Sequence, residues 1–200
     1  MRQVTGSNLA QPSNRVSIQL TLGGHSFSVE SLPQPTSNND EPILFVADTP
    51  RVTLVPTELF DPSIAADYLA LNGLGCRSDE VCVVSDVCDD MVAVIAVATK
   101  AFEAIRHKFG ERAHFSTPLL DNSHSDTDAL VVICGERTAY IRLYRSGLRI
   151  AEAIETNSPE EVLYYVARLA EINTLGDIPI YIIGSDETRK LLKKYYKTVI

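Results

Sequence analysis

The sequence has no long apolar segment. Its longest uninterrupted apolar run, residues 91–98, is far shorter than the about 20 residues that a membrane-spanning helix requires. The first fourteen residues contain no apolar stretch of the kind that a secretion signal carries. We therefore expect a cytoplasmic protein that does not insert into a membrane.

Positive charge is also scarce. The chain has 18 Lys and Arg residues against 26 Asp and Glu, which gives a net charge of −8 at pH 7. Binding to a nucleic-acid backbone needs a basic surface that releases counterions. We therefore expect no nucleic-acid partner.

Cysteine is rare, and the few cysteines do not form a recognisable pattern. They are Cys76, Cys82, Cys88 and Cys134. A 200-residue chain can build a core without disulfides, so free buried thiols are expected. Zinc sites use close Cys pairs or compact His clusters, and neither the cysteines nor His107, His114 and His124 supply one. We assign no metal.

The composition that remains is that of an ordinary globular protein. Hydrophobic residues make up 45% and charged residues 22%, with only 10 Gly and 10 Pro. This is enough apolar material to bury a core, which excludes a largely disordered chain. A polar segment at 118–128 marks a boundary, so we predict a flexible N-terminus at 1–14, a first half at 15–125 and a second half at 126–200.

The first half is predicted to be rich in strands. Alternating apolar residues at 15–22 indicate a strand, Gly23 and Gly24 a tight turn, and 25–30 the returning strand of a hairpin. A proline-containing loop follows at 31–42. Beyond it we predict strands at 43–47, 51–55, 80–84, 91–98 and 112–116, with the pair 80–84 and 91–98 near the sheet centre. One short helix is expected after Pro56, and another begins with Thr99 as its cap and ends at Gly110.

The second half repeats a similar order. Strands at 130–134, 139–145 and 148–154 are separated by short turns, which predicts three antiparallel strands. A helix follows with Ser158 as N-cap, Pro159 in the first turn and Glu161 completing a capping box. A strand at 180–183 and a last helix capped by Asp186 complete the chain.

Three stretches resemble a known family. They are Arg-Val-Thr-Leu-Val-Pro-Thr-Glu-Leu-Phe at 51–60, Tyr-Leu-Ala-Leu-Asn at 68–72 and Asn-Ser-Pro-Glu-Glu-Val-Leu-Tyr-Tyr at 157–165. Together they resemble an uncharacterised bacterial family with the actin-like ATPase fold, over roughly residues 15 to 197. The order of elements in each half likewise resembles the ribonuclease H-like unit, which is paired in the actin, hexokinase and sugar-kinase superfamily.

The resemblance implies an α/β protein with mixed α+β sheets, in which two ribonuclease H-like halves form an actin-like ATPase arrangement. It also implies a helix between residues 30 and 51. Proline at 33, 35 and 42 prevents a long helix there, so we expect a trimmed first half. The family has no established activity that could be transferred to this chain.

Active relatives of this fold carry an acidic residue on the first strand, just before a glycine-containing hairpin, where it serves the metal and the water. The matching stretches here are Leu-Thr-Leu-Gly-Gly at 20–24 and Val-Ile-Cys-Gly-Glu at 132–136, and neither has an acid before its glycine. Magnesium takes oxygen ligands, and phosphoryl transfer depends on the charge stabilisation that they support. We therefore expect no efficient ATP hydrolysis and assign no catalytic residue.

Binding of ATP without hydrolysis is the alternative. Residues 182–186 resemble the strand-Gly-helix corner that receives adenosine in this superfamily, and amides at a helix start can bind an anion. The candidate contacts are Gly23, Gly24, Gly135, Gly184 and Ser185. Each of these residues also fits an ordinary turn or corner, which is the interpretation we favour.

The sequence also lacks the residues that a nuclease or a histidine-based catalytic site would need. A ribonuclease H-like nuclease needs several carboxylates around two metals, whereas Asp86, Asp89 and Asp90 cluster in a predicted hairpin turn, where solvated acids are common. His25 follows Gly24, but no motif places a nucleophile or a carboxylate beside it.

Charge is distributed unevenly along the chain. Residues 1–125 carry 8 basic and 15 acidic side chains, whereas 126–200 carry 10 and 11. Half of those ten bases lie on or after the last predicted helix: Arg189, Lys190, Lys193, Lys194 and Lys197. A solvated helix face accounts for them, and docking to an acidic partner surface is the alternative. The tail at 195–200 ends in apolar residues that can pair with a sheet edge or a second subunit.

These observations favour a non-catalytic module of the actin-like fold that acts through contacts with another protein or a second copy of itself. The alternative is a nucleotide-binding protein that uses a cleft between the two halves with little or no hydrolysis.

Overall fold

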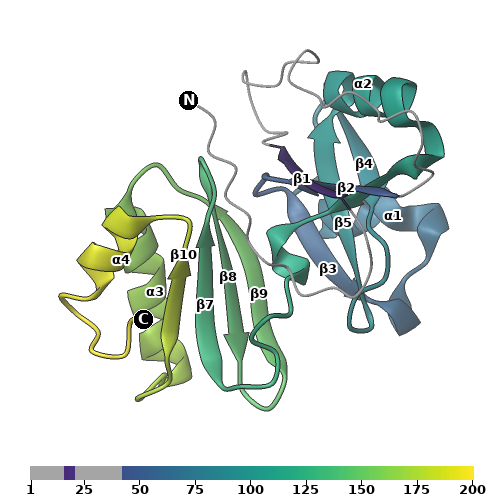
Figure 1. Cartoon of the computed structure of the whole chain (residues 1–200). Helices are drawn as coiled ribbons and strands as arrows, with labels where there is room; N and C mark the ends of the chain where they lie inside the picture. Colours follow the sequence, from purple (N-terminus) through teal and green to yellow (C-terminus); the bar gives the residue numbers. More distant parts are fainter. Residues whose placement is uncertain (1–15, 21–41) are drawn as a thin grey trace.

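The computed structural model describes residues 16–20 and 42–200, with side chains from residue 42 onward. Within these ranges the strands form three sheets (Figure 1). The strands are β1 (Val16–Leu20), β2 (Ile43–Ala47), β3 (Val52–Pro56), β4 (Glu80–Val84), β5 (Met91–Ala98), β6 (Ala113–Ser116), β7 (Ala129–Cys134), β8 (Thr138–Tyr144), β9 (Leu148–Glu155) and β10 (Ile180–Ile183). The helices are α1 (Ala65–Leu71), α2 (Thr99–Phe109), α3 (Pro159–Asn173) and α4 (Asp186–Leu192), with short 3-10 turns η2 (Thr57–Leu59), η3 (Pro62–Ile64), η4 (Gly110–Arg112) and η5 (Pro118–Leu120).

The first sheet has the order β1-β2-β6, and all three strands are parallel. The predicted strand at 15–22 is therefore present as β1, and it pairs with β2, with Val16 opposite Ile43. Gly23, Gly24 and the predicted returning strand at 25–30 lie outside the described residues. Most of the segment between residues 30 and 51, where the resemblance implies a helix, also lies outside the described residues.

The second sheet has the order β3-β5-β4 and is antiparallel. The predicted bounds of β4 and β5 agree with the structure because both strands are apolar runs between polar turns. Only β5 lies at the centre of this sheet, since β4 is at its edge. One face packs against α1 through Leu69, and residues of the other face share a core cluster with Ala101 and Ile105 of α2.

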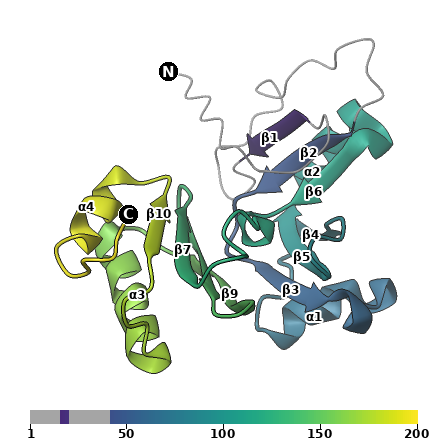
Figure 2. The same ribbon diagram turned by 60° about the horizontal axis from the view of Figure 1, so that its bottom comes forward.

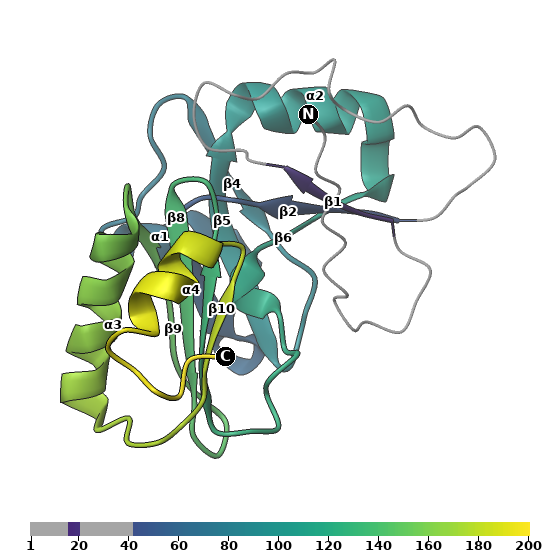
Figure 3. The same ribbon diagram turned by 60° about the vertical axis from the view of Figure 1, so that its left-hand side comes forward.

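The third sheet has the order β10-β7-β8-β9. As predicted, β7, β8 and β9 are antiparallel neighbours, and β10 adds to β7 in parallel. Helices α3 and α4 cover one face of this sheet (Figures 1 and 3). The C-terminal tail pairs with β10 through a parallel bridge between Ile180 and Val199, which confirms that the tail can cover a sheet edge.

Strand β8 is buried along its whole length because both faces of the third sheet are covered. Ala139, Ile141 and Leu143 pack with α3 and α4, whereas Tyr140 belongs to the core built around the first two sheets. Figure 2 shows β1–β6 on one side of this sheet and the helix layer on the other. A polar residue on the inward face of β8 therefore lies at the junction between the sheets.

The helix starts differ in detail from the prediction. Ser158 is the N-cap of α3, as predicted, but Glu161 accepts from the amide of Asn157, one residue before the cap. Thr99 is the first residue of α2 rather than its cap. The cap of α4 is Ser185 rather than Asp186, because the Ser185 side chain reaches the amide of Thr188.

All four cysteines are free thiols. Across the described ranges, no helix has both the length and the apolar character needed to cross a membrane.

Candidate functional site

Two of the candidate glycines meet at one edge of the third sheet. Gly135 follows β7 and Gly184 follows β10, and these strands are parallel neighbours whose C-terminal ends lie together. Gly184 has a φ of +88°, and a Cβ there would overlap the carbonyl oxygen of Cys134. Glycine is therefore required at this corner by close packing of the two chain segments. Gly23 and Gly24 lie outside the described residues.

Ser185, the third candidate at this edge, acts as a helix cap. Its Oγ accepts a hydrogen bond from the amide of Thr188 at 3.1 Å and lies 2.9 Å from the Thr188 hydroxyl oxygen. The helix that it caps has only seven residues. Both contacts satisfy groups of the protein itself, so the described role of Ser185 is structural.

Replacement of this cap gives a first testable prediction. Ser185→Ala is expected to lower the free energy of unfolding by about 1 kcal/mol, because the Thr188 amide loses its acceptor. Ser185→Asn is the matched control, since asparagine also caps helices and is expected to retain stability. Urea unfolding monitored by circular dichroism measures both. Equal losses in the two variants would show that capping is not the role of this side chain.

A carboxylate that the sequence analysis missed lies at this same edge. Asp48 directly follows β2, and only 6% of its surface is exposed. Its Oδ2 accepts a hydrogen bond from the amide of Glu136, in the turn between β7 and β8, at 2.9 Å. A Cβ on Gly135 would collide with the same carboxylate. The glycine in this turn therefore leaves the space that Asp48 fills.

Tyr140 supplies the second hydrogen bond to this carboxylate. Its hydroxyl donates to Asp48 Oδ1 at 2.9 Å and accepts from the amide of Thr49 at 2.6 Å. Burial, followed by the nearby Asp48 charge, raises the pKa of Tyr140 far above its usual value. The hydroxyl therefore stays protonated and acts as a donor. Asp48, Tyr140 and the Glu136 amide join the end of β2 to the β7–β8 turn.

Cys134 and Arg189 complete this edge without forming a reactive pair. Burial raises the pKa of the Cys134 thiol, with Thr188 and Arg189 opposing the rise, so the thiol is protonated near neutral pH and is a poor nucleophile. The Arg189 guanidinium donates to the carbonyl of Ile182 at 2.6 Å and to Asp186 at 2.5 Å. Two of its five N–H donors are thus used inside the protein.

The chemistry available at this edge follows from these contacts. The Asp48 carboxylate accepts one hydrogen bond on each oxygen, from the Glu136 amide on Oδ2 and from the Tyr140 hydroxyl on Oδ1. In the part of the chain that the structure describes, no three His, Cys, Asp or Glu side chains gather into a group that could hold a metal ion. The site thus contains the Asp48 carboxylate, which is held by the glycine-containing turn between β7 and β8 and by the Tyr140 hydroxyl.

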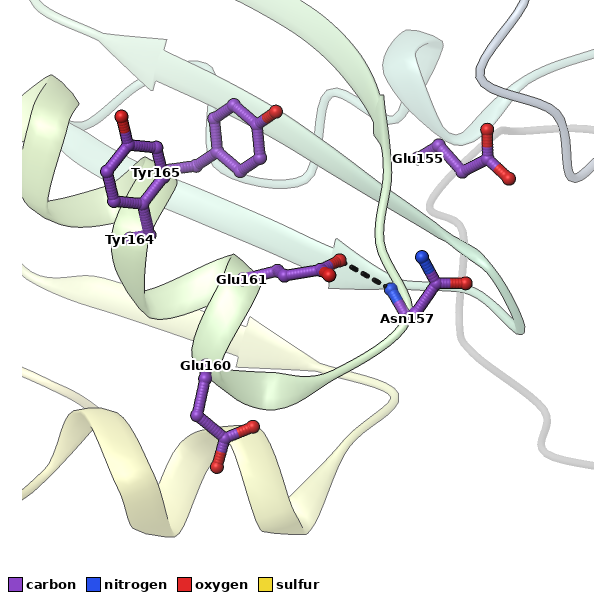
Figure 4. A pocket seen from close by; sticks show the side chains of 6 residues that line it. All are labelled: Glu155, Asn157, Glu160, Glu161, Tyr164 and Tyr165. Atoms are coloured by element: carbon purple, nitrogen blue, oxygen red, sulfur yellow. Dashed lines mark hydrogen bonds between the residues drawn. The ribbon is translucent and has the colours of Figure 1, made fainter.

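A second, separate feature is an open groove at the start of α3 (Figure 4). It has a volume of about 530 Å³ and is lined by Glu155, Asn157, Glu160, Glu161, Tyr164 and Tyr165. The two tyrosine rings stand edge to face, with 60% of Tyr164 and 37% of Tyr165 exposed. We call this feature the α3 groove. It combines carboxylates with aromatic surface, which is a favourable environment for a cation.

The comparisons with known proteins identify the fold. The chain is similar to a Bacteroides thetaiotaomicron protein with actin-like ATPase fold and unknown function, at a TM-score of 0.66 and 16% sequence identity, over 79% of this chain and 67% of that one. The chain thus has the actin-like ATPase fold, which confirms the predicted fold class. No protein-family model matches the chain, and no curated protein matches its sequence.

Two further solved structures are similar only in part. One is an AlfA filament bound to AMPPNP, at a TM-score of 0.34 and 16% identity, over 50% of this chain and 46% of that one. The other is the cytoplasmic domain of EpsL, an inner membrane component of the type II secretion system of Vibrio cholerae, at 0.36 and 11%, over 74% and 64%. Likenesses this distant carry no functional argument.

Proposed function

We propose that this protein is a non-catalytic module of the actin-like ATPase fold that acts through protein contacts in the cytoplasm. In this proposal residues 15–125 and 126–200 are its two halves. The four free thiols support a reducing location.

The contact between Asp48 and the β7–β8 turn carries the proposal. A phosphate-binding turn offers free backbone amides to the ligand. Here the Glu136 amide already donates to Asp48, and the space next to Gly135 contains that carboxylate. A phosphate entering this turn would meet a negative charge and would have to displace it. This arrangement opposes both binding and hydrolysis of ATP.

The alternative, a nucleotide-binding protein, retains one supporting observation. Gly135 and Gly184 lie at adjacent strand ends, where parallel strands of α/β proteins commonly bind ligands. The close contact of Gly184 with the Cys134 carbonyl and the position of Asp48 account for both glycines without a ligand.

A nucleotide assay separates these two functions. We expect no ATP turnover above the no-protein blank, with magnesium present, and no thermal shift with ATP, ADP or GTP. A nucleotide at 100 times its dissociation constant would add about 2.7 kcal/mol of stability, which such a shift detects easily. A clear shift without turnover would establish the alternative, and turnover by pure protein would overturn the non-catalytic proposal.

A further inference from the structure

We infer that the α3 groove binds the lysine-rich end of α4 from a second copy of this chain, which forms a symmetric dimer. The inference rests on the proposed function and names the partner for it. Two oppositely charged regions of the helix layer on the third sheet support it: the carboxylates of the α3 groove, and the lysines at 190–197.

The acidic end of the helix layer has the shape and chemistry to receive a cation. Glu160 is exposed and forms no ion pair with another described residue, and the groove that it lines also has the exposed rings of Tyr164 and Tyr165, from which Glu160 points away in Figure 4. Glu155 pairs with Arg137 at 2.9 Å in an exposed position, where such pairs exchange readily with other partners. An ammonium group gains from both kinds of neighbour, since carboxylates attract its charge and tyrosine faces attract cations.

The basic residues lie at the end of α4 and in the segment that follows it. Lys190, Lys193, Lys194 and Lys197 are all exposed, and none forms an ion pair with a residue of the described chain. Tyr195, between them, is 66% exposed. The lysines therefore present unpaired positive charge next to aromatic surface, in a protein whose net charge is −8.

Within one chain, the lysines near the end of α4 do not pair with the carboxylates of the α3 groove. Helices α3 and α4 pack side by side (Figure 3), yet no ion pair joins these lysines to Glu160 or Glu161. A second copy brings complementary charge without any new component. A two-fold axis repeats each contact, so the acidic groove of each copy meets the lysines of the other and both contacts form together. This self-complementarity favours a second copy over an unrelated basic protein.

Light scattering during gel filtration tests the dimer. At about 0.1 M salt we expect the mass of the wild-type protein to approach twice 22.0 kDa as its concentration rises. At about 1 M salt the screening length falls from about 10 Å to about 3 Å, and we expect dissociation to increase at least about tenfold. A wild-type protein that stays monomeric in low salt overturns the inference.

Charge reversal tests the interface itself. Glu160→Lys and the double variant Lys193→Glu/Lys194→Glu are each expected to be monomeric alone, because like charges then meet in both contacts. Mixed in equal amounts they should dimerise again, since every contact of the mixed dimer joins opposite charges. Glu103→Lys is the matched control: Glu103 is exposed on α2, and this change is expected to leave the dimer intact.

The outcomes separate this inference from the proposed function. A dimer that survives both charge reversals, or a mixture that stays monomeric, overturns the α3 groove as its interface. Neither result restores ATP binding, because these substitutions leave the Asp48 contact untouched. The nucleotide assay on the same samples judges the non-catalytic proposal independently.

Discussion

Asp121→Ala is expected to lower the free energy of unfolding by about 3 kcal/mol, because it leaves a buried guanidinium without its counter-charge. Arg142 on β8 has no exposed surface. Its Nη2 donates to Asp121 Oδ2 at 3.3 Å, and its Nη1 donates to the hydroxyl of Tyr144 at 3.2 Å. The Arg142 Nε has no hydrogen-bond partner. Among the described residues, Asp121 is thus the only carboxylate that forms an ion pair with Arg142.

Urea unfolding compares this variant with two others. Asp126→Ala lies in the same segment, is exposed, and is expected to change stability by less than about 0.5 kcal/mol. Asp121→Leu/Arg142→Met replaces the pair by apolar side chains and is expected to be more stable than Asp121→Ala, since no uncompensated charge remains. If the single and double variants lose equal stability, the buried charge is not the cause.

The same pair shows what the sequence pattern could and could not predict. The polar segment at 118–128 predicts a boundary, because periodicity cannot tell that Asp121 contacts Arg142 on β8. Strands β4, β5 and β10 were predicted with their observed bounds, since each is a short apolar run between polar or glycine-containing turns. Local patterns locate elements but do not reveal which distant polar groups they bring together.

Strand pairing and helix caps show the same limit. The parallel partners of β1 and β2 come from segments far apart in sequence, so their pairing depends on the assembled core rather than on a turn. Ser185 and Asp186 are both good capping residues, and only the backbone conformation decides between them. The start of α3 was predicted correctly because serine, proline and glutamate agree there.

The candidate site was predicted only in part for a related reason. Gly135, Gly184 and Ser185 were chosen from motifs, and the structure places them at adjacent strand ends. Asp48 lies between the predicted strands 43–47 and 51–55, Tyr140 lies within the predicted strand 139–145, and no motif marks either residue as a candidate. Two features of the sequence could have pointed to these residues. Asp48 is a polar side chain at the end of a buried strand, and Tyr140 carries a hydroxyl in the middle of another buried strand. Only the packing of the first and third sheets connects the two residues.

Asp48→Ala is expected to destabilise the protein by about 3 kcal/mol, because one buried and one partly buried donor lose a charged acceptor at once. These donors are the Glu136 amide and the Tyr140 hydroxyl, each 2.9 Å from the carboxylate. Asp48→Asn is expected to lose less. Its amide oxygen can still accept from Glu136, and the Tyr140 hydroxyl has the carbonyl oxygens of Ala47 and Thr49 at 3.3 Å as other acceptors.

A double-mutant cycle with Tyr140→Phe isolates the contact between the two side chains. Because the hydroxyl donates directly to Asp48, we expect the two losses to be non-additive by about 1 kcal/mol. Strict additivity would mean that the two side chains act separately and that the junction is not held by this hydrogen bond.

Asp48→Ala also tests whether the Asp48 carboxylate keeps phosphate out of the β7–β8 turn. In Asp48→Ala the Glu136 amide is free and the negative charge beside Gly135 is gone, so the turn regains the two properties that an anion site needs. Inorganic phosphate should therefore raise the melting temperature of Asp48→Ala more than that of the wild type, relative to chloride at equal ionic strength. Asp48→Asn distinguishes the effect of the negative charge from that of the occupied space, because asparagine removes the charge but still fills the space next to Gly135. An equal response of the wild type and Asp48→Ala to phosphate would show that Asp48 does not exclude anions from this turn, and the non-catalytic proposal would lose the observation that carries it.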